Sequence, residues 1–265
     1  MVDVSKDVWA AGSAYERYVG RWSRPVADEF LDWLGVAPAR VWLDVGCGTG
    51  ALSERILKRA APARVTGVDS ADGFLAHASA HVDDPRVEFL KGDAQALPVR
   101  DASTDVVVAG LVLNFVPDKA KAAAEMRRVT RPGGIVGLYV WYYAEGMQMM
   151  RHFWNAAVAL KPAGSELDEG PRFPICKPEA LRDLFAAAGF RDIETRPIEI
   201  ATVFANFDDY WTPFLGGTGP GPAYCMSLGE ADRAALRDRL KASLPTGADG
   251  KIALTARAYA VKAVA

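Results

Sequence analysis

Apolar and polar positions follow two alternating periods along the first 141 residues of the chain. Short apolar runs, typical of strands buried on both faces, fall at residues 41–45, 64–69, 86–90, 104–110 and 135–141. Helical patterns lie between or before them, at residues 25–34, 51–60, 72–80 and 119–129. This alternation predicts an α/β fold, in which a parallel sheet has right-handed crossovers and helices on both faces. Ligands of such sheets bind beyond the carboxyl ends of the strands.

The regular alternation breaks after residue 141. Further helices are expected at residues 147–160, 178–189 and 229–243, and further strands at 190–200 and 252–262. Two aromatic-rich segments, 142–177 and 201–250, interrupt this pattern, and within the first we expect a loop over 161–174. The simpler interpretation of 142–177 is a hydrophobic helix that covers the sheet. The functional interpretation is that both segments are cap insertions over a ligand site.

Composition limits the classes to which the chain can belong. Its 265 residues are half hydrophobic, which predicts one large domain, 1–265, with insertions and a sizeable core. The 31 basic and 33 acidic residues nearly balance, so we expect no nucleic-acid partner. No apolar run is long enough to cross a bilayer, and residues 1–20 carry charges where a signal peptide is apolar.

The cysteines add a weaker indication. Cys47, Cys176 and Cys225 are few, odd in number and widely spaced, so they form neither a disulfide framework nor a zinc-ligand pattern. A reducing cytoplasm is the simplest compartment for such a chain. His77 and His81 lie four residues apart without a third ligand nearby, and we expect no metal site there.

The strand at 41–45 runs into a turn with three glycines, Gly46, Gly48 and Gly50, before a helix. Glycines there allow a sharp turn and a close approach of a ligand to the backbone, and the free N–H groups of the helix start face the same space. Gly46, Gly48 and Ala51 also fit the dinucleotide pattern G-x-G-x-x-G/A. The glycines alone therefore indicate a cofactor site without identifying the cofactor.

Acids lie at or near the ends of three of the predicted strands. Asp44 precedes the first glycine, where a carboxylate disfavours a pyrophosphate and suits a cation such as the α-ammonium of an amino acid. Asp69 ends the next strand and can accept both hydroxyls of a ribose, although it can also cap the following helix. Asp93 can accept a hydrogen bond from an adenine amine, and the N–H of Ala94 can meet a ring nitrogen.

The order of these motifs from Asp44 to Gly134 resembles the class I S-adenosylmethionine (SAM)-dependent methyltransferases, closest to the group that acts on small molecules. The motif Asp44-x-Gly46-x-Gly48-x-Gly50 is similar to the first motif of that family, and Gly92-Asp93-Ala94-x-x-Leu97-Pro98 is similar to its adenine motif. The tail resembles a bacterial subfamily of uncharacterised members. The resemblance implies a Rossmann-like three-layer sandwich with a seven-stranded, mostly parallel sheet, an antiparallel last strand and helical lid insertions.

The same resemblance suggests how the strand-four end and the N-terminus are used. Leu111 and Phe115 would flank the adenosine, whereas Asn114 is either a ligand contact or ordinary turn packing. Residues 1–34 would form a helical lid with Tyr18 or Arg21 near the carboxylate or sulfonium end of SAM. The alternative is that this aromatic segment only anchors the N-terminus in the core. The expected cofactor contacts are Tyr18, Arg21, Asp44, Gly46, Cys47, Gly48, Asp69, Ser70, Asp93, Ala94, Leu111 and Phe115.

The resemblance leaves the acceptor open. The sequence after strand four lacks an Asn-Pro-Pro-Tyr motif, which argues against methylation of DNA bases. We expect a small-molecule acceptor and a monomer or homodimer. A general base is needed only if the acceptor must lose a proton, and the candidates are His152, Tyr142 and Tyr143. The alternatives are an NAD-dependent oxidoreductase, which leaves Asp44 and Asp93 without a role, and a non-catalytic SAM-binding module.

Overall fold

The computed structural model describes residues 16–217 and 219–265, and these divide into two compact units. In the described chain, unit 1 comprises residues 16–21, 141–174 and 199–257 without 218, and unit 2 comprises 22–140, 175–198 and 258–265. Residues 1–15 of the predicted lid lie outside the described residues. The predicted organisation as one domain with a lid and two cap insertions therefore stays a prediction.

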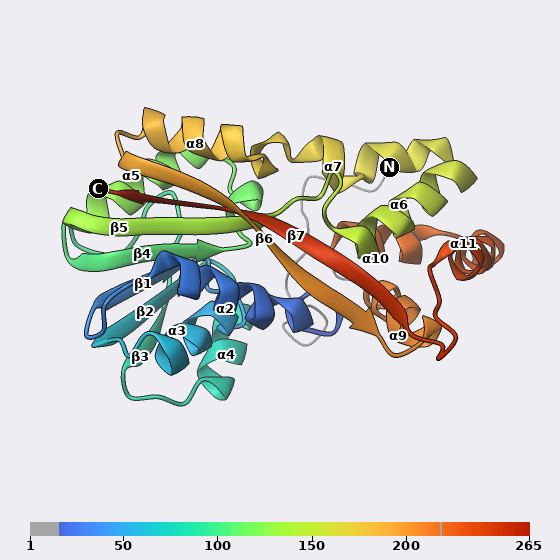
Figure 1. Ribbon diagram of the computed structural model, residues 1–265, viewed down its shortest axis with the longest axis horizontal. Coiled ribbons are helices and arrows are strands. Elements are labelled where there is room, and N and C mark those ends of the chain that lie inside the picture. Colours follow the sequence, from blue (N-terminus) through green and yellow to red (C-terminus); the bar gives the residue numbers. More distant parts are fainter. Residues whose placement is uncertain (1–15, 218) are drawn as a thin grey trace. The chain divides into compact units, whose positions relative to one another are not determined.

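Seven strands form one sheet in the order β3-β2-β1-β4-β5-β7-β6 (Figure 1). The strands are β1 (Val41–Val45), β2 (Arg64–Asp69), β3 (Val87–Lys91), β4 (Thr104–Gly110), β5 (Thr130–Trp141), β6 (Arg191–Phe204) and β7 (Ile252–Val264). β1 to β5 pair in parallel. β7 runs antiparallel to β5, because hydrogen bonds join residue 133 to 265 and residue 142 to 257. The Rossmann-like α/β fold with an antiparallel last strand is confirmed.

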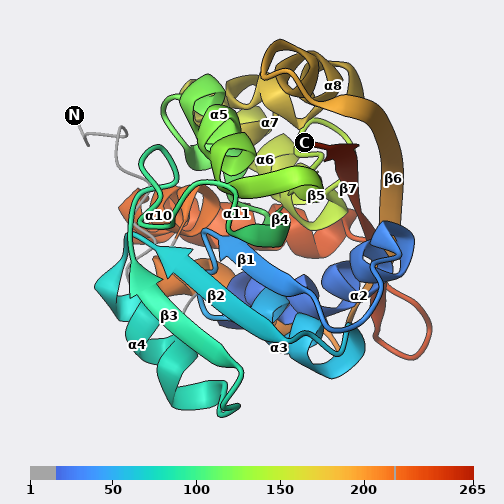
Figure 2. The ribbon, with the colours of Figure 1, turned by 90° about the vertical axis from the view of Figure 1, so that its left-hand side faces the viewer.

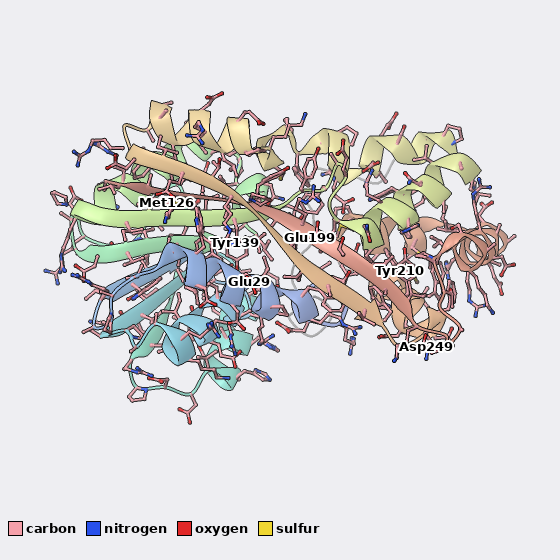
Figure 3. The ribbon with its side chains drawn as sticks, viewed as in Figure 1. Glu29, Met126, Tyr139, Glu199, Tyr210 and Asp249 are labelled. Carbon is pink, nitrogen blue, oxygen red and sulfur yellow. The ribbon has the colours of Figure 1, made fainter. Side chains whose placement is uncertain are left out.

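Helices cover both faces of the strands in unit 2. They are α2 (Ser23–Leu34), α3 (Ala51–Arg59), α4 (Asp72–His81), α5 (Lys119–Val129) and α8 (Pro178–Ala187), with the short 3₁₀ helix η2 (Leu113–Phe115). Figure 2 shows α2, α3 and α4 on one face of β1 to β5 and α5 and α8 on the other. The core between them is apolar; for example, the Tyr139 ring of β5, labelled in Figure 3, packs 4.7 Å from the Phe30 ring of α2.

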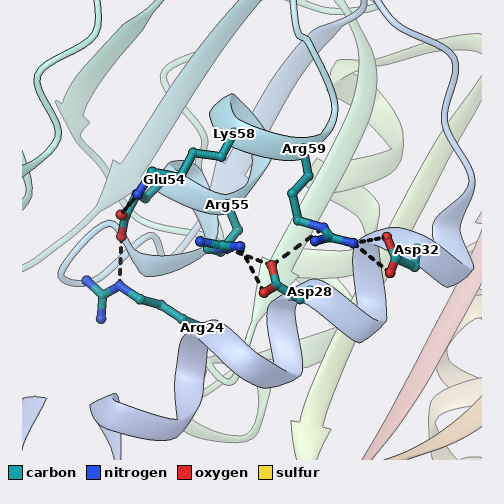
Figure 4. A network of polar contacts seen from close by, with 7 residues as sticks. All are labelled: Arg24, Asp28, Asp32, Glu54, Arg55, Lys58 and Arg59. Atoms are coloured by element: carbon teal, nitrogen blue, oxygen red, sulfur yellow. Dashed lines mark hydrogen bonds and ion pairs between the residues drawn. The ribbon is translucent and has the colours of Figure 1, made fainter.

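An ion-pair network joins α2 to α3 at the surface of unit 2 (Figure 4). The Arg55 guanidinium donates to both oxygens of Asp28, at 2.6 and 2.9 Å, and Arg59 donates to Asp32. Glu54 accepts from Arg24 of α2 and also from Lys58 of its own helix. These pairs fix α3 along α2, and α3 is the helix that follows the glycine turn.

Unit 1 is mostly helical and rich in buried aromatic side chains. Its elements are η1 (Gly20–Trp22, at its boundary), α6 (Gln148–Leu160), η3 (Pro162–Leu167), α7 (Glu169–Arg172), α9 (Phe207–Trp211), η5 (Thr212–Gly216), α10 (Pro220–Ser227) and α11 (Glu230–Ser243). The Tyr210 hydroxyl, labelled in Figure 3, donates to the backbone oxygen of Met149 at 2.8 Å. This bond ties α9 to α6 inside the unit.

Two sequence predictions need correction. The segment 161–174 was expected to be a loop, but it folds into η3 and α7 before the 3₁₀ helix η4 (Pro174–Cys176). Asp168, whose side chain accepts from the N–H of Gly170, supplies the helix cap that starts α7. β5 begins at Thr130 instead of residue 135, and its register against β4 shifts between Thr104 and Val106, with Gly133 at φ +78° taking up the irregularity.

Candidate cofactor site

The turn after β1 has the conformation that its glycines predict. Gly46, Gly48 and Gly50 have φ values of +69°, +52° and +85°, a region that other residues enter only with strain. The N–H groups of Gly46 and Cys47 both donate to the backbone oxygen of Val68, at 2.7 and 3.1 Å. The end of β2 therefore holds the start of the turn, and Gly50 leads directly into α3.

The space around the turn is closed on one side and open on another. A Cβ atom at Gly46 would lie 2.5 Å from the Val112 side chain, so the end of β4 packs directly on the turn. A Cβ atom at Gly48 would meet no heavy atom of the described chain within 4 Å. The Cys47 thiol is buried, and its sulfur would lie 3.0 Å from a Cβ at Gly67. The open position at Gly48 is where a ligand can approach the backbone.

Asp44 lies at the centre of this arrangement with 0% of its surface exposed. Its Oδ2 accepts a hydrogen bond of 2.7 Å from the Ser53 hydroxyl of α3, whereas its Oδ1 has no hydrogen-bond partner in the described part of the chain. Burial raises the pKa of Asp44 to about 7, and Asp69 adds to the rise while the Ser53 bond opposes it. A buried acceptor without a partner is costly, so a cationic donor would stabilise it strongly.

Asp69 connects the glycine turn to the next helix. Its Oδ2 accepts from the N–H of Gly48 and its Oδ1 accepts from the N–H of Ala71, both at 2.9 Å. The side chain remains half-buried beside the exposed Ser70. Because a carboxylate has about four acceptor positions, these two bonds leave capacity for ribose hydroxyls. Asp69 can therefore accept from the N–H of Ala71 at the start of the next helix and from ribose hydroxyls at the same time.

Asp93 is exposed, and a neighbouring glutamine holds its side chain. Asp93 accepts from the N–H of Gln95 at 2.8 Å and from the Gln95 amide nitrogen at 3.1 Å, and these bonds lower the pKa of Asp93. The Gln95 side-chain oxygen in turn accepts from the N–H of Asp118 at the start of α5. Ala94, half-buried, lies between the two. This link keeps the Asp93 carboxylate ionised and fixes it at the tip of β3.

The end of β4 carries a strained residue and an unpaired amide. Leu111 has φ +61°, which is unusual for a residue with a Cβ, and its N–H donates to the Tyr139 oxygen at 2.8 Å. Asn114 is 3% exposed, and neither its amide oxygen nor its amide nitrogen has a partner among residues 16–217 and 219–265. Phe115 is half-buried next to it. These features are typical of a strand end whose unpaired polar groups form hydrogen bonds with a ligand.

The remaining predicted residues belong to unit 1. The Tyr18 ring, 1% exposed, packs edge-on against Phe214 at 5.3 Å. The Arg21 guanidinium donates to Asp209 at 2.7 Å and lies 5.4 Å from the centre of the Phe204 ring.

The base candidates are also in unit 1. Tyr143 is buried and Tyr142 half-buried, and burial lowers the pKa of the half-buried His152. The predicted roles of these side chains stay predictions, whereas unit 2 by itself brings Asp44, the glycine turn, Asp69 and the β4 end together.

Three polar residues of consequence were not singled out from the sequence. Ser53 is a hydroxyl on the buried face of α3, among Leu52, Ile56 and Leu57, and that position was a usable signal. Gln95 lies inside the adenine motif but at a position taken as variable. Glu169, buried in unit 1, came from a segment interpreted as a loop, so nothing in the pattern marked it.

Comparison with known proteins supports the SAM interpretation. Residues 43–138 match the family model described as a methyltransferase domain. An uncharacterized methyltransferase of Mycobacterium tuberculosis is 40% identical over 139 residues, 52% of this chain and 53% of that protein. A malonyl-[acyl-carrier protein] O-methyltransferase of Serratia marcescens is 34% identical over 156 residues, 55% of this chain and 58% of that protein. The chain thus spans little more than half the length of these relatives.

Solved structures share the fold at low identity. A phosphoethanolamine N-methyltransferase 2 of Haemonchus contortus, in complex with SAM, aligns with a TM-score of 0.61 at 19% identity, covering 96% of this chain and 56% of that one. The [4+2]-cyclase SpnF aligns with a TM-score of 0.57 at 20% identity, covering 98% of each chain. At this identity the likeness concerns the fold alone. Within the described ranges, none of the helices has the length and apolar character needed to cross a membrane.

Proposed function

Because the chain belongs to the class I SAM-dependent methyltransferases through residues 43–138, we propose that it binds SAM in unit 2 and methylates a small-molecule acceptor. The observation that carries this proposal is the buried Oδ1 of Asp44, which has no hydrogen-bond partner among residues 16–217 and 219–265. An α-ammonium group is the donor that it lacks, and the open backbone at Gly48 gives the ligand room. An NAD-dependent oxidoreductase leaves this carboxylate without a counterpart, so we set that alternative aside.

Each acid of unit 2 takes one part of the cofactor in this proposal. Asp44 would hold the ammonium, Asp69 with Ser70 the ribose, and Asp93 with the Ala94 N–H the adenine edge. Gly46, Cys47 and Gly48 would form the backbone around the amino-acid end, while Leu111 and Phe115 would flank the adenosine. Tyr18 and Arg21 of unit 1 remain candidates for the lid. Bound SAM supplies a methyl group on a sulfonium, which is already a good leaving group.

The work left to the protein is mainly to bind and orient the acceptor. For a hydroxyl acceptor a base is also required, and we retain His152, Tyr142 and Tyr143 as candidates. The lowered pKa of His152 leaves its imidazole neutral near pH 7, the form that accepts a proton. We further propose that 142–177 and 201–250 are insertions that carry acceptor contacts, which their many aromatic side chains support.

The remaining predictions concern context. The balanced charge, with a formal net charge of −2, supports a small acceptor over a nucleic acid. Three free cysteines in the described chain are consistent with a reducing compartment, so we propose a cytoplasmic monomer or homodimer.

The test is transfer of a labelled methyl group from SAM. The full chain and the Asp44→Asn variant are each incubated with labelled SAM and a small-molecule extract of bacterial cells, and products are separated by size and polarity. We expect label in a low-mass organic product with the native chain and a large loss with the variant. Binding of SAM without any transfer would instead indicate the non-catalytic module, and label in nucleic acid or protein would contradict the small acceptor.

A further inference from the structure

Unit 1 contains a buried carboxyl group that none of the roles above uses. Glu169, at the start of α7, is 1% exposed, and its Oε2 accepts a hydrogen bond from the Trp154 indole N–H. Its Oε1 is buried and finds no hydrogen-bond partner within the described ranges. Leaving a buried carboxylate oxygen unpaired costs folding free energy, so such an atom requires an explanation.

A second unpaired group belongs to the same unit. The Tyr18 hydroxyl is buried, and it has no hydrogen-bond partner in the part of the chain that the structure describes. Burial raises the pKa of Tyr18, and the negative charge of Glu169 raises that pKa further, so the two groups interact electrostatically. Unit 1 thus holds one buried hydroxyl and one buried carboxylate oxygen that lack a hydrogen-bond partner among the described residues.

Aromatic rings connect these two polar groups. Tyr18 packs on Phe214, Phe214 stacks on Phe153 at 4.3 Å, and Phe153 meets Trp154 edge-on at 5.2 Å. Trp154 is the side chain that holds Glu169. These rings offer apolar, flat surfaces, which suit a ring or another apolar body better than a highly polar molecule.

The absence of a side chain at Gly221 of α10 is part of the same arrangement. A Cβ atom there would lie 3.1 Å from the Tyr18 hydroxyl oxygen and 3.5 Å from ring atoms of both Phe153 and Phe214. Glycine thus lets the helix backbone approach the hydroxyl and the two rings closely. A larger residue at this position would displace the rings or the hydroxyl.

We propose that Glu169 and Tyr18 form a binding site within unit 1 for a compound with an apolar ring body and a hydroxyl or amine group. Glu169 Oε1 accepts the hydrogen bond from the O–H or N–H of the compound, Tyr18 provides a second polar contact, and the aromatic rings contact its body. The site lies wholly within unit 1, and the inference does not rest on the proposed function. It gives Tyr18 a contact to this compound in addition to its predicted place in the lid.

The charge of the site favours a donor group over an acceptor group. Asp168 adjoins Glu169 in the chain and raises its pKa, whereas Arg151, which lowers it, already donates to both oxygens of Asp168. Burial is the largest cause of the rise, and it brings the pKa of Glu169 to about 7. A bound amine or hydroxyl stabilises the ionised form, so binding of a cationic amine should strengthen as the pH rises from 5 towards 7.

Three compounds of nearly equal shape test the site without the need for SAM. Benzyl alcohol, benzylamine and ethylbenzene differ only in whether the terminal group is a hydroxyl, an amine or a methyl, and their binding to the full chain is measured by ligand-observed NMR. We expect at least one of the two donors to bind about tenfold or more tightly than ethylbenzene. The comparison of alcohol with amine identifies the group that the site prefers.

Two variants and a matched control complete the experiment. Glu169→Gln keeps an oxygen for the Trp154 N–H and should weaken donor binding about 10- to 100-fold, while Glu166→Gln, an exposed acid three residues earlier, should bind as the native chain does. Tyr18→Phe removes a hydroxyl that has no hydrogen-bond partner in the described part of the chain, so it should weaken donor binding with no loss of thermal stability.

Several results would overturn the site. They are equal binding of ethylbenzene and the donors, no binding of any of the three, or native-like donor binding by both Glu169→Gln and Tyr18→Phe. Binding of S-adenosylhomocysteine, the demethylated product, is measured in parallel and should be unchanged in Glu169→Gln. Failure of the cofactor proposal is thereby distinguished from failure of this one.

Discussion

At the scale of single residues, both candidate sites are marked by buried polar atoms that have no hydrogen-bond partner among the described residues. Asp44 of unit 2 and Glu169 of unit 1 each have one oxygen bonded by a neighbour and one oxygen unpaired among the residues described. Sequence reasoning found Asp44 because its position before the glycines is informative. It could not find Glu169, because an acid in a proline- and glycine-rich stretch has the same pattern whether it is exposed or buried.

The pH dependence of cofactor binding follows from Asp44. Its pKa near 7 means that below pH 7 a proton must leave before the carboxylate can pair with an ammonium. We expect the affinity for S-adenosylhomocysteine to fall by up to about tenfold per pH unit from pH 7 to pH 5, where an α-amino group remains protonated. Titration of the native chain and of Asp44→Asn checks this. The variant should bind weakly and with a nearly flat pH profile, and a native profile that is already flat would contradict the role of Asp44.

The glycine turn offers a second residue-scale test with a matched control. Gly48 and Gly133 both have positive φ, and a Cβ at either would meet no heavy atom of the described chain within 4 Å. Alanine at each position should cost about 1 kcal/mol of stability through backbone strain. Only Gly48→Ala should also weaken cofactor binding, because the added methyl group occupies the open space at the turn. Chemical denaturation and calorimetry measure the two effects, and equal binding by both variants would argue against a ligand at Gly48.

At the scale of elements, the strands and helices of the parallel half follow from the hydrophobic pattern. β4 and α5 have the predicted bounds, since a continuous apolar run and a helix with an Asp118 cap leave little freedom. Two predictions were wrong: the segment that forms η3 and α7, and the start of β5. Both depend on helix caps or on pairing partners that are distant in sequence. Such partners cannot be identified from a local pattern.

The ion pairs between α2 and α3 give a prediction at this scale (Figure 4). The Asp28–Arg55 pair is bidentate and partly buried, whereas Asp32 is mostly exposed. We expect Asp28→Ala to destabilise the native state by about 0.5–1 kcal/mol, less in high salt, and Asp32→Ala to have a smaller effect. Urea denaturation at low and high ionic strength measures both. A larger loss from Asp32→Ala than from Asp28→Ala would contradict this ranking of the two pairs by burial, and no loss from either would show that the network does not position α3.

At the scale of the whole molecule, the described chain forms two compact units, and each contains one buried acid with an oxygen that has no partner among the described residues. The hydrophobic pattern predicted the sheet, and it placed Asp44, Asp69 and Asp93 at or near strand ends, where the structure has them; their contacts to a cofactor stay a prediction. It did not predict that unit 1 contains a buried carboxyl of its own. Aromatic positions such as Phe153 and Phe214 look the same in a core and around a ligand until their polar neighbours are known.

The stability of the ligand-free chain should therefore depend on pH in an unusual direction. The folded-state pKa values of Asp44 and Glu169 are raised to about 7, so the stability they contribute is full below their unfolded values and is lost as the pH rises through 7. From pH 5 to pH 8 the free energy of unfolding should fall by roughly 5 kcal/mol, about 2.5 kcal/mol from each acid. Carboxylates with lowered pKa, such as Asp84 and Asp93, stay ionised throughout this range.

Urea denaturation across that pH range checks this prediction. Asp44→Asn and Glu169→Gln should each reduce the slope, because an amide does not titrate. A free energy of unfolding that rises with pH between 5 and 8 in the native chain would show that neither acid is buried as described.

The central claim is that Asp44 awaits the ammonium of an adenosyl amino acid, and calorimetric titration at pH 7 tests it most directly. S-adenosylhomocysteine is titrated into the native chain in two buffers of different ionisation enthalpy. Because the pKa of Asp44 is about 7 before binding, we expect saturable binding with release of about half a proton, and no such release with Asp44→Asn. Absence of binding, or binding with the same proton balance in both proteins, would contradict the account.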